Sequence, residues 1–306
     1  MTSPFAYYPL LPSVPLHRPA SFVLAAVLVP AGCVTAVPCG DPGSICLATD
    51  DLSHVRVNVM PDALVVADLD ADGARDLVGA SGRAGTITVV WGDEAGFTGS
   101  ATTWSIDQEV AGIVVADLDA DGRLDLATAL PRADAVAVLR GRGARSFSAP
   151  ERHSAGAVPR ALIAADLDGA GPPELVTADL DGGTVTVLHQ FVAAPAIVVG
   201  PGPRALAAGD LDSDGHLDVA VALADADAVQ VLRGDGQGGL SPAALHPVGA
   251  APYDLVVADL DGDGHLDIAT ADSLDDAVSV LFGDGAGDLR ERTTWPTVAL
   301  PSRPTA

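Results

Sequence analysis

The chain has 306 residues, with 16 basic and 41 acidic side chains, and its formal net charge is −25. All 16 basic residues are arginines, and they are too few for the basic face that a nucleic-acid-binding protein needs, so we expect no nucleic-acid partner. A hydrophobic content of 48% argues against a disordered acidic chain, and 33 Gly and 23 Pro argue against a coiled coil. The longest apolar run is about half of the roughly 20 residues that a membrane helix requires.

An apolar run at residues 22–32 is typical of the hydrophobic part of a secretory signal peptide. Arg18 precedes the run and Cys33 follows it directly. This order resembles the lipobox of bacterial lipoproteins, although Pro30 stands where a leucine is usual, and the resemblance implies lipidation of Cys33. Residues 1–33 are therefore interpreted as a signal peptide or lipoprotein leader, and an apolar tail without a targeting role is the alternative.

Three cysteines, Cys33, Cys39 and Cys46, lie near the N-terminus, and the rest of the chain has none. If Cys33 is lipidated, Cys39 and Cys46 remain to close a short loop as a disulfide in an oxidising compartment. Three free thiols are the alternative. Residues 34–52 are interpreted as a linker that carries this disulfide.

Five similar segments dominate the rest of the chain. They occupy residues 64–80, 113–129, 162–178, 206–222 and 255–271. Their first aspartates are Asp68, Asp117, Asp166, Asp210 and Asp259. The steps between these aspartates are 49, 49, 44 and 49 residues, and a period this regular indicates a repeat architecture.

Each repeat predicts four short antiparallel strands. In the last repeat, apolar runs at 255–258, 266–271 and 278–282 predict the first three strands, and a glycine-rich turn follows them. A more polar fourth strand is predicted at places such as 102–106. No stretch after residue 50 has a convincing helical period. In the third repeat, residues 189–192 replace the glycine-rich turn, which predicts a shorter hairpin in an otherwise intact unit.

A four-stranded antiparallel unit that repeats every 40–50 residues is typical of a β-propeller blade. We therefore predict an all-β fold, a β-propeller of five visible blades over residues 53–300, followed by a tail at 301–306. A parallel β-helix is the alternative. Closure is left open, because residues 55–59 would add an outer strand to the last blade while 293–298 already supply one, and a diverged partial blade near the N-terminus is a further alternative.

The loop after each first strand has the pattern Asp-x-Asp-x-Asp-Gly-x-x-Asp, with carboxylates at positions 1, 3, 5 and 9. Several hard oxygen ligands in one tight loop suit Ca²⁺, and glycine at position 6 permits the sharp turn. The predicted ligands of the four full loops are Asp68, Asp70, Asp72 and Asp76; Asp117, Asp119, Asp121 and Asp125; Asp210, Asp212, Asp214 and Asp218; and Asp259, Asp261, Asp263 and Asp267. The third loop keeps Asp166, Asp168 and Glu174 but has Ala170 at position 5, so we expect a degenerate fifth site there.

The Asp loops, the glycine-rich turns that end in Phe or Leu and the period together resemble the FG-GAP/VCBS repeat family, which is akin to the propeller of integrin α subunits. The resemblance covers roughly residues 55–298. It implies a propeller that binds Ca²⁺ in secreted or cell-surface proteins. The family usually has seven blades, whereas five repeats are visible in this chain.

The main functional prediction is a secreted or surface-anchored, monomeric binding scaffold for a protein or glycan, with structural calcium and with any membrane attachment made through a lipid on Cys33. A glycan-binding lectin is the alternative, in which Trp91, Trp104 and Trp295 form a sugar platform rather than pack between blades. A propeller enzyme acting on polysaccharide has no supporting catalytic motif. A purely architectural role is the third hypothesis. The position-7 residues His216 and His265 are expected to have exposed side chains.

Overall fold

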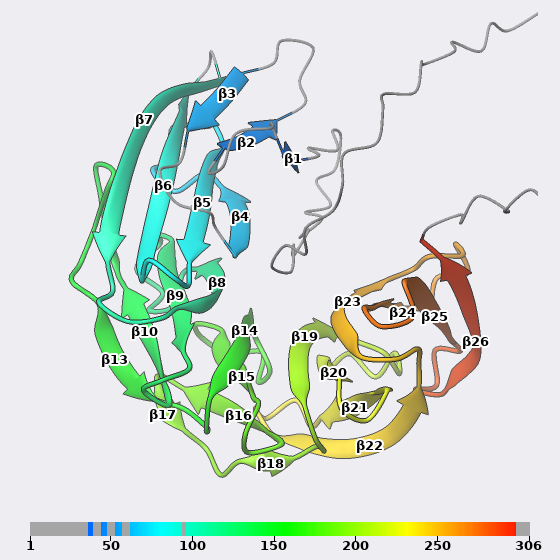
Figure 1. Cartoon of the computed structure of the whole chain (residues 1–306). Helices are drawn as coiled ribbons and strands as arrows, with labels where there is room; N and C mark the ends of the chain where they lie inside the picture. Colours follow the sequence, from blue (N-terminus) through cyan, green and yellow to red (C-terminus); the bar gives the residue numbers. More distant parts are fainter. Residues whose placement is uncertain (1–35, 39–43, 48–52, 57–61, 94–95, 298–306) are drawn as a thin grey trace, which may run out of the picture.

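The computed structural model describes residues 36–38, 44–47, 53–56, 62–93 and 96–297. Every element of regular structure in this part of the chain is a β-strand. Five antiparallel sheets, called blades 1 to 5 in chain order, follow one another around an arc (Figure 1). The fold is the predicted β-propeller of four-stranded blades.

Each blade is formed by one repeat, and its strands pair in the order of the sequence. Blade 1 contains β4 (Ala63–Ala67), β5 (Asp76–Ser81), β6 (Thr86–Asp93) and β7 (Gly96–Ser105). Blade 2 contains β8 (Ala111–Ala116), β9 (Asp125–Leu130), β10 (Ala135–Leu139) and β13 (Glu151–Ser154). Blade 4 contains β19 (Pro203–Gly209), β20 (Asp218–Leu223), β21 (Ala228–Gly234) and β22 (Leu240–Pro247), and blade 5 contains β23 (Pro252–Ala258), β24 (Asp267–Asp272), β25 (Ala277–Gly283) and β26 (Leu289–Pro296).

Two blades depart from this plan. In blade 2, the glycine-rich turn carries its own hairpin of β11 (Gly141–Gly143) and β12 (Ser146–Phe147). Blade 3 contains β14 (Pro159–Ala165), β15 (Glu174–Asp179) and β16 (Thr184–His189), and its outer edge is divided between β17 (Val192–Ala193) and β18 (Ile197–Val198), both of which pair with β16. Gln190 and Phe191 form the turn between β16 and β17 with φ values of 46° and 67°. A two-residue turn with positive φ at both positions closes a tight hairpin, so the predicted shortening of the third repeat is confirmed.

The first strand of each repeat is the innermost strand of its blade. Contacts between neighbouring blades join β4 to β8, β8 to β14, β14 to β19 and β19 to β23. Gly209, at the end of β19, shows how tightly they pack, because an added Cβ would lie 2.8 Å from side-chain atoms of both Val257 and Leu266 in blade 5. This crowding explains why a residue without a side chain precedes the Asp loop of blade 4.

The faces of neighbouring blades bury the core between them. Ile87 of blade 1 and Leu139 of blade 2 are both fully buried in one such cluster. Trp91 lies in the same cluster, and Trp104 packs edge-on against Phe147 with ring centroids 5.2 Å apart. These two tryptophans therefore pack between blades, whereas Trp295 on β26 is 48% exposed.

The prediction that residues 55–59 add a strand to the last blade is wrong for the described part of that segment. β3 (Ser53–Arg56) pairs with β2 (Ser44–Leu47), which pairs with β1 (Ala36–Pro38), in a separate three-stranded sheet. This sheet includes part of the predicted linker and lies beside blade 1, at the opposite end of the arc from blade 5 (Figure 1). β26 supplies the outer strand of blade 5, so no position there is left for β3.

Replacing Gly141 with alanine is expected to destabilise blade 2. An added Cβ there would lie 2.4 Å from the backbone oxygen of Leu124, and backbone cannot move aside as a side chain can. We expect a loss of about 2–3 kcal/mol, or roughly 5–10 °C in the thermal midpoint measured by circular dichroism.

Gly122→Ala is the matched control, because it makes the same change in the same blade where an added Cβ meets nothing within 4 Å. The φ of Gly122 is +83°, so this variant should lose only about 1 kcal/mol. Equal midpoints for the two variants would contradict the close approach at Gly141.

Candidate metal loops and the axial pocket

The five Asp loops occupy equivalent places in the fold. Each loop joins the innermost strand of a blade to its second strand, and the position-9 carboxylate is the first residue of that second strand. Position 6 has a φ between 82° and 92° in all five loops, as at Gly73 and Gly264, so the glycine there permits the turn as predicted. Position 4 is also left-handed in every loop.

The loops bring three carboxylates together in each blade, with ligand atoms within 4.8 Å of one another, and each such group could hold a metal ion. The groups are Asp68, Asp70 and Asp76 in loop 1; Asp117, Asp119 and Asp125 in loop 2; Asp166, Asp168 and Glu174 in loop 3; Asp210, Asp212 and Asp218 in loop 4; and Asp259, Asp261 and Asp263 in loop 5. Loop 3, expected to be degenerate, therefore gathers its three carboxylates as the full loops do.

Not every predicted ligand belongs to these groups. The position-5 residues Asp72, Asp121 and Asp214, and the position-9 residue Asp267, lie outside them. The position-5 carboxylate of every full loop, including Asp263 in loop 5, accepts a hydrogen bond from the backbone nitrogen two residues later, at 2.8–2.9 Å. The structure thus shows three gathered carboxylates in a loop where the spacing predicts four.

The position-9 aspartate also has a role that the sequence pattern does not reveal. In blade 1, Asp76 accepts hydrogen bonds from the backbone nitrogens of Leu69 in the loop and Gly92 at the end of β6, both at 2.8 Å. The same pair of bonds recurs in the other full blades at Asp125, Asp218 and Asp267. All four aspartates are at most 2% exposed, so one buried carboxylate ties each loop to the third strand.

Burial makes these carboxylates costly to ionise. Desolvation raises the pKa of Asp76, Asp125 and Asp218 above the usual aspartate range, although the backbone hydrogen bonds act in the opposite direction. The carboxylates at loop positions 3 and 5 add to the rise at Asp76 and Asp218. A cation among such groups favours their charged form.

Arginines neutralise the position-3 aspartate in three loops. Arg233 forms an ion pair with Asp212 at 3.0 Å, and Arg140, at the equivalent place in blade 2, pairs with Asp119. In blade 1 that place is taken by Trp91, and Arg145 crosses from blade 2, stacks over the indole ring and pairs with Asp70. In the described part of loop 5 no arginine pairs with a loop carboxylate.

Asp212 gives a direct test of whether loop 4 fits a cation. Its side chain is about nine-tenths buried, and one oxygen, Oδ2, pairs with Arg233. The other oxygen, Oδ1, is buried and has no hydrogen-bond partner among the described residues. Because an unpaired buried carboxylate oxygen is costly, and the carboxylates of Asp210 and Asp218 lie close by, the residues of loop 4 fit a hard cation.

Other predicted site residues fall outside this picture. Cys33 and Cys39 lie outside the described residues, and the side chain of Cys46 does so too, so lipidation and the disulfide stay predictions. His216 is exposed as expected, but His265 is half-buried, and its ring lies against Gly285. The described part of the chain contains no helix long and apolar enough to cross a membrane.

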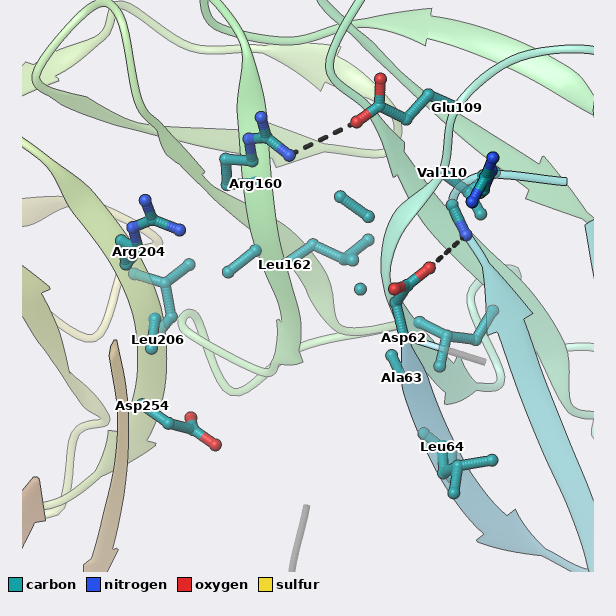
Figure 2. A pocket seen from close by; sticks show the side chains of 18 of the residues that line it. Asp62, Ala63, Leu64, Glu109, Val110, Arg160, Leu162, Arg204, Leu206 and Asp254 are labelled. Atoms are coloured by element: carbon teal, nitrogen blue, oxygen red, sulfur yellow. Dashed lines mark hydrogen bonds and ion pairs between the residues drawn. The ribbon is translucent and has the colours of Figure 1, made fainter. Parts of the chain in front are cut away.

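A second feature, which we call the axial pocket, lies at the other end of the innermost strands. Residues at or near the starts of all five of these strands line it, and its volume is about 1060 Å³. Figure 2 shows Arg160, Arg204, Asp62 and Asp254 around this pocket. The sequence contains one signal for this pocket, the polar residues at the strand starts. These positions differ between repeats, whereas the apolar positions that follow them are alike.

The acidic residues of the axial pocket differ in how far they are paired. Glu109 pairs with Arg132 at 2.8 Å and with Arg160 at 3.5 Å, and Asp62 accepts a hydrogen bond from the Gly82 nitrogen. Among the described residues, the hydrogen-bond partner of Asp254 is the backbone nitrogen of Leu255, and burial raises the pKa of Asp254.

Replacing Arg233 with glutamine should weaken loop 4 most when calcium is absent, because the guanidinium then offsets the repulsion between carboxylates. The pair is partly exposed, so we expect at most about 1 kcal/mol, or 2–4 °C, in chelator and less in calcium. Arg290→Gln, which removes the exposed pair with Asp284 outside the loops, is the control. An equal loss for Arg233→Gln in chelator and in calcium would contradict this role.

Replacing Asp254 with asparagine should stabilise the protein at neutral pH. The folded pKa of Asp254 is raised, so its ionisation above the unfolded pKa opposes folding, and this cost disappears as the pH falls through the folded pKa. The thermal midpoint of Asp254→Asn should therefore exceed that of the wild type at pH 7, and the difference should shrink towards pH 4. A difference that grows on acidification would contradict this.

Comparisons with known proteins agree with this geometry. The FG-GAP-like repeat family matches residues 68–128 and 210–270. Each match begins at the first aspartate of one Asp loop and ends in the second strand of the following blade. No curated protein matches the chain.

Among solved structures, similar folds come from proteins with different activities. A virginiamycin B lyase from Staphylococcus aureus has a TM-score of 0.63 at 10% identity, with 89% of this chain and 84% of that chain covered. An Agrocybe aegerita lectin that recognises non-reducing terminal N-acetylglucosamine has a TM-score of 0.52 at 16% identity, with 82% and 74% covered. BBS1N, solved in complex with ARL6DN, has a TM-score of 0.56 at 18% identity, with 76% and 68% covered.

At these identities the similarity shows the fold alone. The repeat matches confirm the assignment made from the Asp loops: the chain contains FG-GAP-like repeats, at residues 68–128 and 210–270, within a β-propeller fold.

Proposed function

We propose that this protein is a calcium-stabilised β-propeller that acts outside the cytosol as a binding scaffold. The observation that carries the metal part is Asp212 in loop 4, where one buried carboxylate oxygen has no partner among the described residues while two further carboxylates lie close by. The same arrangement of carboxylates at positions 1, 3 and 9 recurs in loops 1 to 3, and loop 5 gathers the carboxylates of positions 1, 3 and 5.

Calcium is the cation that these groups suit best. All the gathered ligands are carboxylate oxygens, and Ca²⁺ accepts six to eight oxygen ligands in a flexible geometry, whereas Mg²⁺ demands a near-ideal octahedron and keeps its waters. A bound ion would supply positive charge among the carboxylates. The residues of the chain would do the rest, since Asp76 and its equivalents hold each loop against the third strand.

A location outside the cytosol is proposed on two grounds. The apolar run at 22–32 followed by Cys33 has the pattern of a secretory or lipoprotein leader. Calcium modules with Kd values of roughly 10⁻⁴–10⁻³ M work where calcium is abundant, as it is outside cells. Attachment to a membrane would then be made through a lipid on Cys33.

Binding rather than catalysis is proposed because the recurring acidic groups are accounted for by the loops and their hydrogen bonds. The related folds include a lyase, a lectin and a protein-binding complex, so the fold by itself does not decide between these activities. The joint sugar platform of Trp91, Trp104 and Trp295 is not supported, since the first two pack between blades 1 and 2. A glycan-binding site elsewhere on the propeller remains the second candidate function.

Calcium should raise the thermal midpoint strongly. With a Kd of roughly 0.1 mM and calcium at about 2 mM, each site contributes about 1.8 kcal/mol, so four sites should raise the midpoint by more than about 10 °C relative to excess chelator. Mg²⁺ at the same concentration should give a smaller shift. The measurement is differential scanning fluorimetry of the full chain.

Asp212→Asn should reduce the calcium-induced shift, and Asp284→Asn, which changes an acidic residue outside the metal-ligand groups, should leave it unchanged. An equal midpoint in calcium and in chelator for the wild type would refute the proposed stabilisation.

A further inference from the structure

The axial pocket lies apart from the Asp loops. The loops follow the C-terminal ends of the innermost strands, whereas the pocket is lined by residues at and around the N-terminal ends of the same strands. A ligand in the pocket would therefore not compete with a cation in the loops. The pocket also draws on all five repeats, so it exists only when the blades are assembled.

The charge of the pocket differs from that of the chain. Among 16 arginines in a chain of net charge −25, four line the pocket: Arg83, Arg132, Arg160 and Arg204. Four acidic residues line it as well: Asp62, Asp107, Glu109 and Asp254. The pocket is thus formally neutral in a strongly acidic molecule, so its lining carries no net negative charge that would repel an anion.

Two of the arginines are placed to bind a ligand. Arg160 and Arg204 are the second residues of the adjacent innermost strands β14 and β19. Arg204 lies over the ring of Tyr253, with Cζ 4.9 Å from the ring centroid, and has no carboxylate partner in the part of the chain that the structure describes. A guanidinium stacked on an aromatic ring is held in place while the N–H groups at its edge stay free to bind a carboxylate in bidentate fashion.

Arg160 can also donate further hydrogen bonds to a ligand. Its contact with Glu109 is long, at 3.5 Å, and Glu109 is also held by Arg132 at 2.8 Å. Its Nε is buried without a hydrogen-bond partner among the described residues. Figure 2 shows Arg160, Arg204, Leu162 and Leu206 around the pocket, and the two leucines add apolar surface to its lining.

We propose that the axial pocket binds a carboxylated sugar, the uronic acid of an acidic glycan, with Arg204 and Arg160 holding the carboxylate. This inference rests on the proposed function as a binding scaffold, and it names the ligand class and the site. Asp254 and Asp62 would face the hydroxyl groups of the sugar, because carboxyl groups accept hydrogen bonds from hydroxyls. The apolar surface of the lining would contact the C–H face of the ring.

The mixed lining favours a carboxylate over a phosphate or sulfate ester. The four acidic residues repel a densely charged ligand, whereas a sugar with one negative charge and several neutral hydroxyls matches both kinds of group. A volume of about 1060 Å³ lies at the upper end of the usual range for ligand sites, roughly 300–1,000 Å³, and leaves room for more than one sugar unit.

The test is isothermal titration calorimetry of the full chain in constant calcium with three tetrasaccharides. The probes are a hyaluronan tetrasaccharide, which carries glucuronic acid without sulfate, a neutral N-acetylglucosamine tetrasaccharide and a sulfated heparin tetrasaccharide. We expect saturable binding of the hyaluronan probe, and at least tenfold weaker binding of the other two. Absence of saturable binding, or tighter binding of the sulfated probe, would overturn the proposal.

Variants locate the binding. Arg204→Gln and Arg160→Gln should each lower the affinity for the hyaluronan probe at least tenfold. Arg290→Gln makes the same charge change at an exposed pair with Asp284 and should leave this affinity unchanged. Equal affinity of the wild type and both pocket variants would overturn the assignment to this pocket. The calcium-induced shift of the thermal midpoint is measured in parallel for each variant and tests the calcium-stabilised scaffold separately. If sugar binding fails while this shift is normal, the inference about the pocket is refuted and the proposed function is not.

Discussion

The structure depends on a buried carboxylate held by two backbone amides. In blade 1, Asp76 accepts one hydrogen bond from the loop, at Leu69, and one from the end of the third strand, at Gly92, and the other full blades repeat the arrangement. The close approach of that third strand requires glycine, because an added Cβ at Gly92 would lie 2.1 Å from the backbone oxygen of Arg75. In the four full repeats, one aspartate and one glycine thereby fix the position of the acidic loop. A cation bound in the loop would offset the cost of burying the charged carboxylate.

The two ends of the innermost strands differ in how far their residues vary between repeats. At one end of the innermost strands, every repeat has nearly the same acidic loop, because the same local geometry must form five times. At the other end the equivalent residues differ between repeats: they are Asp62, Ala111, Tyr253 and the two arginines Arg160 and Arg204. Uniform residues serve a structural role that each blade performs alone, whereas varied residues converge on the axis to form one composite pocket.

The sequence predicted the blades and the acidic loops well, because both are local. The period of 49 residues, the strand pattern and the glycine at position 6 depend only on neighbours along the chain. The features that it did not predict depend on contacts between repeats or on competing hydrogen bonds. Asp72 and its equivalents turn towards the loop backbone, Arg145 reaches Asp70 from the next blade, and the axial pocket needs five blades at once. The pairing of β3 in a separate sheet was missed for the same reason.

Counting bound calcium tests the central claim most directly. Equilibrium dialysis of the full chain against radioactive calcium, near the millimolar concentrations expected outside cells, should give four to five ions per chain, and the double variant Asp210→Asn with Asp212→Asn should give one fewer. A folded wild-type protein that retains less than one calcium ion per chain under these conditions would contradict the account.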